Sequence, residues 1–248
     1  QSQEQEKLHF EKPPRQEGDR LNSPAEKRIR KRYKEISKQR LKTHSNTKGS
    51  NSCSEEDSLA LVAIYNEMNG ENWTNQDNWL TESPVKNWWG ITVVNNRVKV
   101  IDFFIDHDVT QNVSGTFPEE FWQLTALTFF DLRYNSIEDS ISSEIKNLTN
   151  LKYMVLGHNK LKGTIPEEME NLSNLELLWL HNNQFEGAIP KELDNLSNLK
   201  TLTLYMNQFK ELPDLSGLNL DNCYISNNLF DFKDLETVNI NWDNLPNY

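Results

Sequence analysis

Two histidines are the first side chains in this sequence whose types and spacing could support chemistry. His158 and His181 stand 23 residues apart, at neighbouring positions of two similar segments. Imidazoles on adjacent strands could bind a metal ion or change charge near neutral pH. No cysteine or carboxylate at matching positions completes a ligand set, so we expect solvent-exposed histidines, no metal site and no cofactor.

The carboxylates give little support for catalysis. Asp102, Asp106 and Asp108 do not follow the DxDxDG order of a calcium loop. Glutamate pairs such as Glu167 and Glu168 fall in segments that return the chain between strands, where we expect no shared pocket. The sequence has neither a GxSxG motif nor a glycine-rich phosphate loop. We therefore expect no catalytic residue and no enzyme activity.

A repeated scaffold must position these side chains. The stretch LGHNKLKGTIPEEMENLSNLE (156–176) is matched 24 residues later by LHNNQFEGAIPKELDNLSNLK (180–200). The frame LxxLxLxxNxL begins at 127, 151, 175 and 199, with a shorter copy from 220 and an imperfect first copy from 98. Six copies exceed the roughly three that a stable stack needs. Each LxLxx segment predicts a short parallel strand, about 4.8 Å from the next.

The frame and its second half, LxGxIPxxLxxLxxL, resemble the plant-type class of leucine-rich repeat proteins over about residues 54–248. The resemblance implies an α/β solenoid, a right-handed superhelix with a parallel concave sheet and a helical, tryptophan-rich N-terminal cap. Plant receptor ectodomains normally carry a cysteine pair in this cap, whereas Trp88-Trp89-Gly90-Ile91 stands here without one. In this respect the chain looks more like bacterial surface and secreted repeat proteins, such as those of the Bacteroidetes.

Four segments are predicted along the chain. Residues 1–53 form a polar tail with a basic helix at about 24–42 and a linker, and residues 54–97 form the cap. Ser54 and Asp57 make a candidate capping box at the start of the cap helix. Residues 98–236 hold the six repeats. Residues 237–248 are short for a C-terminal cap, which leaves open a continuation of the natural protein beyond Tyr248.

Charge separates the tail from the body. Residues 1–49 hold 14 Lys or Arg against 7 Asp or Glu, a net of +7, and residues 50–248 hold 12 against 30, a net of −18. The acidic body disfavours nucleic acid as a partner. Stable membrane insertion is not expected, because no apolar run of about 18 residues exists and the basic helix has a thin apolar stripe. The tail is expected to dock on the acidic body or to remain solvated.

The repeat frame also predicts the structural role of particular side chains. One asparagine per copy should form a buried ladder whose amides satisfy backbone groups of the turns. Asp139 and Ser142 replace the glycine and proline of the second half in the copy 127–150, so the return side should depart from the pattern there. The ladder asparagines are Asn135, Asn159, Asn183, Asn207 and Asn228.

Strand alternation sends the variable positions beside the frame leucines to the concave face. Many of them are aromatic, and rigid aromatic side chains are typical binding anchors. The alternative is that adjacent aromatics only stack to cover the sheet. The candidate ligand-binding residues are Phe129, Asp131, Arg133, Tyr153, His158, Trp179, His181, Tyr205 and Tyr224.

The sequence therefore predicts a non-catalytic recognition module that binds a protein or glycan partner through its concave face. The resemblance implies an extracellular or cell-surface location. Two other functions stay open. A structural spacer or adhesin stalk would need the sheet aromatics only for packing, and an inhibitor of a secreted enzyme would use its acidic body against a basic target.

Overall fold

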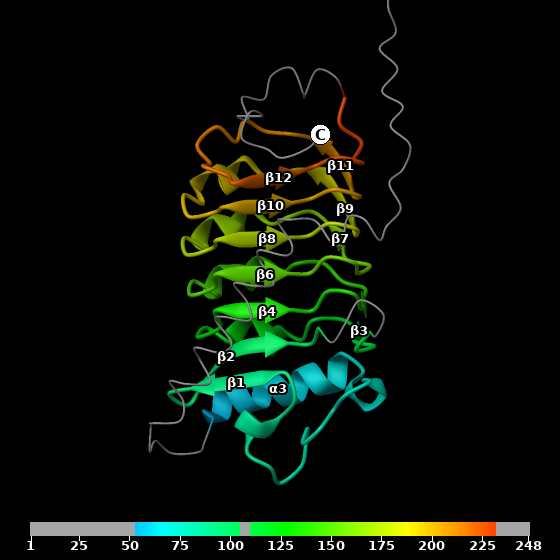
Figure 1. Ribbon diagram of the computed structural model, residues 1–248, viewed down its shortest axis with the longest axis vertical. Helices are drawn as coiled ribbons and strands as arrows, with labels where there is room; N and C mark the ends of the chain where they lie inside the picture. Colours follow the sequence, from blue (N-terminus) through cyan, green and yellow to red (C-terminus); the bar gives the residue numbers. More distant parts are fainter. Residues whose placement is uncertain (1–52, 105–109, 232–248) are drawn as a thin grey trace, which may run out of the picture. The chain divides into compact units, whose positions relative to one another are not determined.

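The structure is a computed structural model that describes residues 53–104 and 110–231 (Figure 1). All of these residues belong to the unit 49–248. The predicted basic helix at 24–42, the C-terminal end at 237–248, Asp106 and Asp108 lie outside the described residues.

A seven-stranded sheet runs the length of the described repeats, in the order β1-β2-β4-β6-β8-β10-β12 (Figure 1). β1 pairs with β2 in antiparallel orientation, and every later neighbour is parallel. The sheet confirms the predicted parallel strands and adds β1, which the sequence analysis did not foresee. The strands are β1 (Ile91–Val94), β2 (Arg97–Asp102), β4 (Phe129–Asp131), β6 (Tyr153–Val155), β8 (Leu177–Trp179), β10 (Thr201–Thr203) and β12 (Asn222–Tyr224).

The strand register reproduces the spacing of the sequence frame. Phe129 pairs with Tyr153, Tyr153 with Leu177, and Leu177 with Thr201, each a step of 24 residues. Thr201 pairs with Asn222 after the shorter step of 21. Because the side chains of a strand alternate between its two faces, this register aligns equivalent positions of the copies in rows across the sheet.

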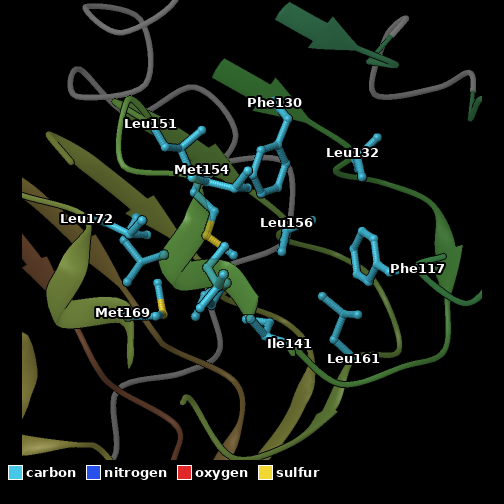
Figure 2. Packing of buried hydrophobic residues seen from close by; sticks show 14 of the residues in the cluster. Phe117, Phe130, Leu132, Ile141, Leu151, Met154, Leu156, Leu161, Met169 and Leu172 are labelled. Carbon is cyan, nitrogen blue, oxygen red and sulfur yellow. The ribbon is translucent and has the colours of Figure 1, made fainter. Parts of the chain in front are cut away.

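The core lies between this sheet and the return side of each repeat (Figure 2). Frame residues such as Phe130, Met154 and Leu156 are fully buried there, and Met169 and Leu172 meet them from the return side. Burying one such side chain contributes about 1.5–3 kcal/mol. Since every repeat buries a similar set, the stability of the array is spread along the chain.

The return side consists of 3-10 helices and short strands. Its three-stranded sheet, β11-β9-β7, is separate from the pair β3-β5. The pairing of the short return-side strands is therefore interrupted beside the copy that carries Asp139. There Asp139 Oδ2 accepts the N–H of Phe117 at 2.7 Å, and the predicted local departure is confirmed. The elements are η3 (Glu119–Gln123), η4 (Ser143–Asn147), η5 (Glu167–Asn171), η6 (Lys191–Asn195), β3 (Ser114–Gly115), β5 (Ser136–Ile137), β7 (Lys162–Gly163), β9 (Gln184–Ala188) and β11 (Gln208–Glu211).

The asparagine ladder joins each turn to its neighbour. Asn159 accepts the N–H of Ile137 at 3.0 Å and donates to the carbonyls of Leu132 and Leu156 at 2.9 and 3.1 Å. Asn183, Asn207 and Asn228 bond in the same way. Asn135 likewise accepts the N–H of Val113 at 3.0 Å, but it donates to the carbonyls of Leu132 and Arg133 in its own copy. The predicted ladder is thus confirmed in its hydrogen bonds, although of its five asparagines only Asn159 and Asn207 are buried.

The cap begins with helix α3 (Glu55–Glu67), which Ser54 caps by accepting the N–H of Asp57 at 3.2 Å. The other half of the predicted capping box is wrong. Asp57 does not return to the N–H of Ser54, which donates to the carbonyl of Asn96 at 2.6 Å. The carboxylate of Asp57, 1% exposed, instead accepts from Arg97 at 3.0 Å and from the N–H of Val98 at 2.6 Å. Asp57 thereby ties the helix to strand β2.

Clustered tryptophans fill the space beside α3, as predicted. The rings of Trp73 and Trp79 lie 5.0 Å apart, and those of Trp79 and Trp88 lie 4.8 Å apart. Each indole donates to a backbone carbonyl at 2.8 to 3.0 Å. The connecting turns include η1 (Gly70–Asn72) and η2 (Val85–Asn87). The cluster continues into the first repeat, because Trp73 also packs on Phe103 at 4.8 Å.

Candidate functional site

The concave face is defined here as the surface of the seven-stranded sheet that is turned away from the core. The predicted rows lie on it in the predicted register. One row holds Val100, Phe129, Tyr153, Leu177, Thr201 and Asn222, and the next holds Asp102, Asp131, Val155, Trp179, Thr203 and Tyr224. A third row follows two residues later, with Phe104, Arg133, Gly157, His181, Tyr205 and Ser226.

The expected solvent exposure of the histidines is wrong for His181, and other side chains of the rows are buried as well. Asp131 is 2% exposed, Trp179 6% and His181 7%, although none of the three belongs to the hydrophobic core. Strands one step apart bring rings of neighbouring copies into contact, so that the side chains cover one another. The rows therefore form a packed layer of their own on the outer side of the sheet.

His181 and Tyr205 form the centre of this layer. Their rings stack 4.6 Å apart at 13°. The Nδ1 atom of His181 lies 3.0 Å from the hydroxyl of Thr203, and the ring of Trp179 lies 5.8 Å away. Burial, with smaller effects of the charges of His158 and Arg133, lowers the pKa of His181 to about 3. His181 is therefore neutral at physiological pH and does not act as a pH switch there.

Gly157 makes the position of His181 possible. A Cβ atom at this glycine would lie 2.6 Å from Cε1 of His181, a distance at which one of them must move. Every other copy has a side chain at this position of the row: Phe104, Arg133, His181, Tyr205 and Ser226. The missing side chain lets the imidazole lie against the sheet, and this glycine was not among the predicted site residues.

The two histidines lie close together, as predicted, with ring centroids 5.1 Å apart at 87°. His158 stacks on Tyr134 at 4.2 Å and 15° and forms a hydrogen bond with Asn182. In each of the five later copies the residue at this position has a left-handed backbone, with φ between 55° and 57°. A turn with one left-handed residue thus follows each of β4, β6, β8, β10 and β12. Among the described residues, no group of three His, Cys, Asp or Glu is arranged to hold a metal ion.

Asp131 and Arg133 form the charged part of the layer. The Nε atom of Arg133 lies 3.0 Å from Oδ2 of Asp131, and Oδ1 accepts the N–H of Arg133 at 3.1 Å. Burial raises the pKa of Asp131 to about 7, against the opposing effect of Arg133, and the neighbouring carboxylate of Asp102 raises it further. The guanidinium also lies 4.0 Å above the ring of Phe104 and 5.4 Å from that of Trp179.

Three predicted residues lie further from this centre. Tyr153 donates its hydroxyl to Glu176 at 2.9 Å, and its ring is 6.2 Å from that of Phe129. Tyr224 is half-buried on β12, beside Thr203 in the register. The structure therefore brings together Asp131, Arg133, His158, Trp179, His181 and Tyr205, and leaves Phe129, Tyr153 and Tyr224 at the margin.

The indole of Trp179 is the one tryptophan side chain on this face among the described rows. Its Nε1 atom is buried, and no described residue accepts a hydrogen bond from it. The three buried indoles of the cap all have a carbonyl partner. A buried donor without a partner costs free energy, so the indole of Trp179 is an unusual feature of this face.

The comparison with family models identifies the repeats. The Leucine Rich Repeat model matches residues 126–148, 150–172 and 174–196. The chain contains leucine-rich repeats. Their parallel sheet and cap form a leucine-rich repeat solenoid, so the predicted fold is confirmed. The comparison with curated proteins gave no match.

Solved structures agree with this fold. The PEPR1 chain of the PEPR1–AtPEP1 complex is similar with a TM-score of 0.63 and 25% identity, over 71% of this chain and 25% of that one. The BIR3–SERK2 complex from Arabidopsis thaliana gives 0.53 and 26%, over 62% and 83%. The Arabidopsis thaliana BIR2 ectodomain gives 0.60 and 19%, over 75% and 99%, and supports the fold alone. This leucine-rich repeat chain thus spans a quarter of the length of PEPR1. No helix among its described residues has the length and apolar character to cross a membrane.

Proposed function

We propose that this leucine-rich repeat chain is a non-catalytic recognition module that binds a protein partner through its concave face. The observation that carries the proposal is the layer around Trp179, His181 and Tyr205, in which Trp179 and His181 are buried by specific contacts outside the core cluster. Packing of the solenoid alone does not account for a buried indole N–H without an acceptor. A bound partner would supply one.

Two of the similar structures are themselves complexes. PEPR1 was solved with AtPEP1, and BIR3 with SERK2. They support recognition of another polypeptide as the kind of function that such a solenoid performs. A glycan partner, an extracellular or cell-surface location and an origin among bacterial surface proteins stay predictions from the sequence. Docking of the basic segment 24–42 on the acidic body also stays a prediction, which rests on charge alone.

The proposal can be tested by capture of partners from extracellular material with the full chain as bait. The test variant carries Trp179→Ala and Tyr205→Ala, and the control carries Glu186→Ala on the exposed surface of β9. Circular dichroism must show that all three baits are folded. We expect one or more partners to be lost with the double variant and retained with the control.

Equal recovery from all baits would contradict the proposed role of the concave face. It would favour the spacer or stalk, in which the stacked rings only cover the sheet. The inhibitor function makes a different prediction. Its captured partner would be a basic secreted enzyme whose inhibition is lost at high salt, because ionic attraction is screened there.

A further inference from the structure

The C-terminal end of the described array leaves frame positions uncovered. In the copies that begin at 127, 151, 175 and 199, the apolar frame residues are all fully buried. In the last copy Leu220 and Phe230 are half-buried, and the adjacent Leu229 is 57% exposed. Terminal copies of a repeat array normally turn a polar surface to water, so an apolar end of this kind indicates a surface that a partner covers.

The backbone at this end is incomplete as well. The residue after each strand donates its N–H to the strand of the next copy, as Leu204 does to the carbonyl of Tyr224 at 2.7 Å. β12 is the last strand of the described sheet (Figure 1), and no described residue accepts the N–H of Ile225, which follows it. Ile225 is 7% exposed. Because an unpaired backbone group at a buried residue costs free energy, an extended chain along the edge of β12 would stabilise this end.

The sequence that follows has the pattern of such a chain. Residues 232–248, which lie outside the described part, come directly after the last copy. Leu235, Val238 and Ile240 repeat the LxxLxL spacing of the frame. From 237 to 242, in the order TVNINW, polar and apolar residues alternate, which is typical of a strand with one buried face. Frame and alternation thus agree that Val238 and Ile240 belong on the buried side.

A tethered segment has an advantage over a separate partner at this surface. A short link gives the segment an effective concentration on the order of millimolar, whereas a second copy of the chain competes only at its own concentration. The segment also brings little charge with it, because Asp243 is the one charged residue in the sequence 237–248. Its contact with an apolar surface therefore requires little desolvation of charge.

We propose that residues 235–242 lie in extended conformation along the edge of β12 and cover the C-terminal end of the array. Val238 and Ile240 face the apolar frame residues of the last copy, and a carbonyl of the segment accepts the N–H of Ile225. The polar residues between them face water and extend the concave face by one strand. The proposal needs no ligand on the concave face, so it can fail or hold independently of the proposed function.

The two cysteines of the chain are natural reporters for a test on the full chain. Cys223 is the middle residue of β12 and 5% exposed, so its thiol reports on the cover of this end. Cys53 is half-buried directly before the cap helix and reports on the integrity of the array. The rate at which N-ethylmaleimide labels each thiol is followed by mass spectrometry, and circular dichroism monitors the fold.

The test variant carries Val238→Asp and Ile240→Asp, which place charges on the side that the proposal buries. The matched control carries Thr237→Asp and Asn239→Asp. It adds the same two charges to the same segment, one position away and on the side that the proposal leaves in water.

We expect Cys223 to be labelled roughly tenfold faster in the test variant than in the natural chain, because its thiol becomes accessible when the segment leaves the edge of β12. The control should change this rate less than about twofold, since charges on a solvated face have little effect on local stability. Cys53 should react at the same rate in all three proteins.

Equal labelling of Cys223 in the test variant and the control would overturn the proposal. A labelling rate that falls with protein concentration, together with a dimer in analytical ultracentrifugation, would assign the surface to a second copy and overturn it as well. Faster labelling of both cysteines would report unfolding of the whole array. In that case Ile240→Ser is compared with Asn239→Ser, and the proposal holds only if the ratio of the Cys223 rate to the Cys53 rate rises in Ile240→Ser alone.

Discussion

In the N-terminal cap one buried carboxylate holds the helix to the sheet, whereas in the repeat array five asparagines share the equivalent task. Asp57 accepts from Arg97 and from the N–H of Val98, across 40 residues of chain. Each ladder asparagine instead links a turn to the turn before it. The array can therefore lose one link and keep the others, whereas in the cap the ion pair with Arg97 and the bond from Val98 both depend on one side chain.

The largest expected effect is in the cap. Asp57→Ala leaves the N–H of Val98 buried without an acceptor and Arg97 without its partner. We expect the free energy of unfolding to fall by about 3–5 kcal/mol, the usual cost of breaking a buried pair. Urea denaturation followed by circular dichroism measures it. Asp57→Asn keeps an acceptor oxygen and should lose less; equal losses would mean that the charge alone matters.

A smaller effect is expected in the array. Asn159→Ala removes the acceptor of the Ile137 N–H and the donor to two carbonyls. The expected loss is about 2–3 kcal/mol, because these groups are buried. Asn228→Ala should cost less, since Asn228 is half-buried at the last described repeat and water can replace it. If Asn159→Ala lowered the free energy of unfolding as much as Asp57→Ala, the five asparagines would not share the task of joining the turns.

On the concave face, Gly157→Ala tests the packed layer. The added Cβ would meet the imidazole of His181, and we expect a loss of about 1–3 kcal/mol, typical of overpacking. The stacking of His181 on Tyr205 should also change, which near-ultraviolet circular dichroism can follow. The control is Ser226→Ala, at an exposed position in the same row of the concave face as Gly157. Gly217→Ala would be a poor control, because a Cβ atom there would meet the carboxylate of Asp194.

The smallest expected effect is a dependence on pH. Burial lowers the pKa of His181 to about 3 from its usual 6.5, so below pH 6.5 the unfolded chain takes up a proton that the folded chain does not. Stability is therefore lost as the pH falls from 6.5 toward 3. Asp131, with its pKa raised to about 7, acts oppositely, because the folded chain binds the extra proton between pH 4 and 7.

The contribution of His181 can be isolated by comparison with His181→Gln. The difference in unfolding free energy between this variant and the natural chain should change by roughly 1–2 kcal/mol between pH 6.5 and 5, in favour of the variant at lower pH. Urea denaturation at a series of pH values measures it. A constant difference over this range would show that His181 is not buried as a neutral ring.

The repeat frame alone predicted most of the fold. Leucines and asparagines at a fixed spacing determine strand, turn and register, because each copy buries its apolar side chains only against the next. Alternation along the strands likewise placed Asp131, Trp179 and Tyr153 on one face correctly. The predicted capping box failed at Asp57, because its partner Arg97 is distant in sequence and no local pattern indicates the pair.

What the sequence by itself determined is the scaffold and the list of side chains on its concave face. Only the tertiary structure decided how those side chains use one another. It folded His181 over Gly157, set Arg133 between Asp131 and the ring of Phe104, and left the indole of Trp179 without a described acceptor. The frame positions recur in every copy, so their spacing predicts the local strand and turn. These contacts instead join unlike residues of different copies. Their energies depend on distances and burial that exist only after the copies have stacked.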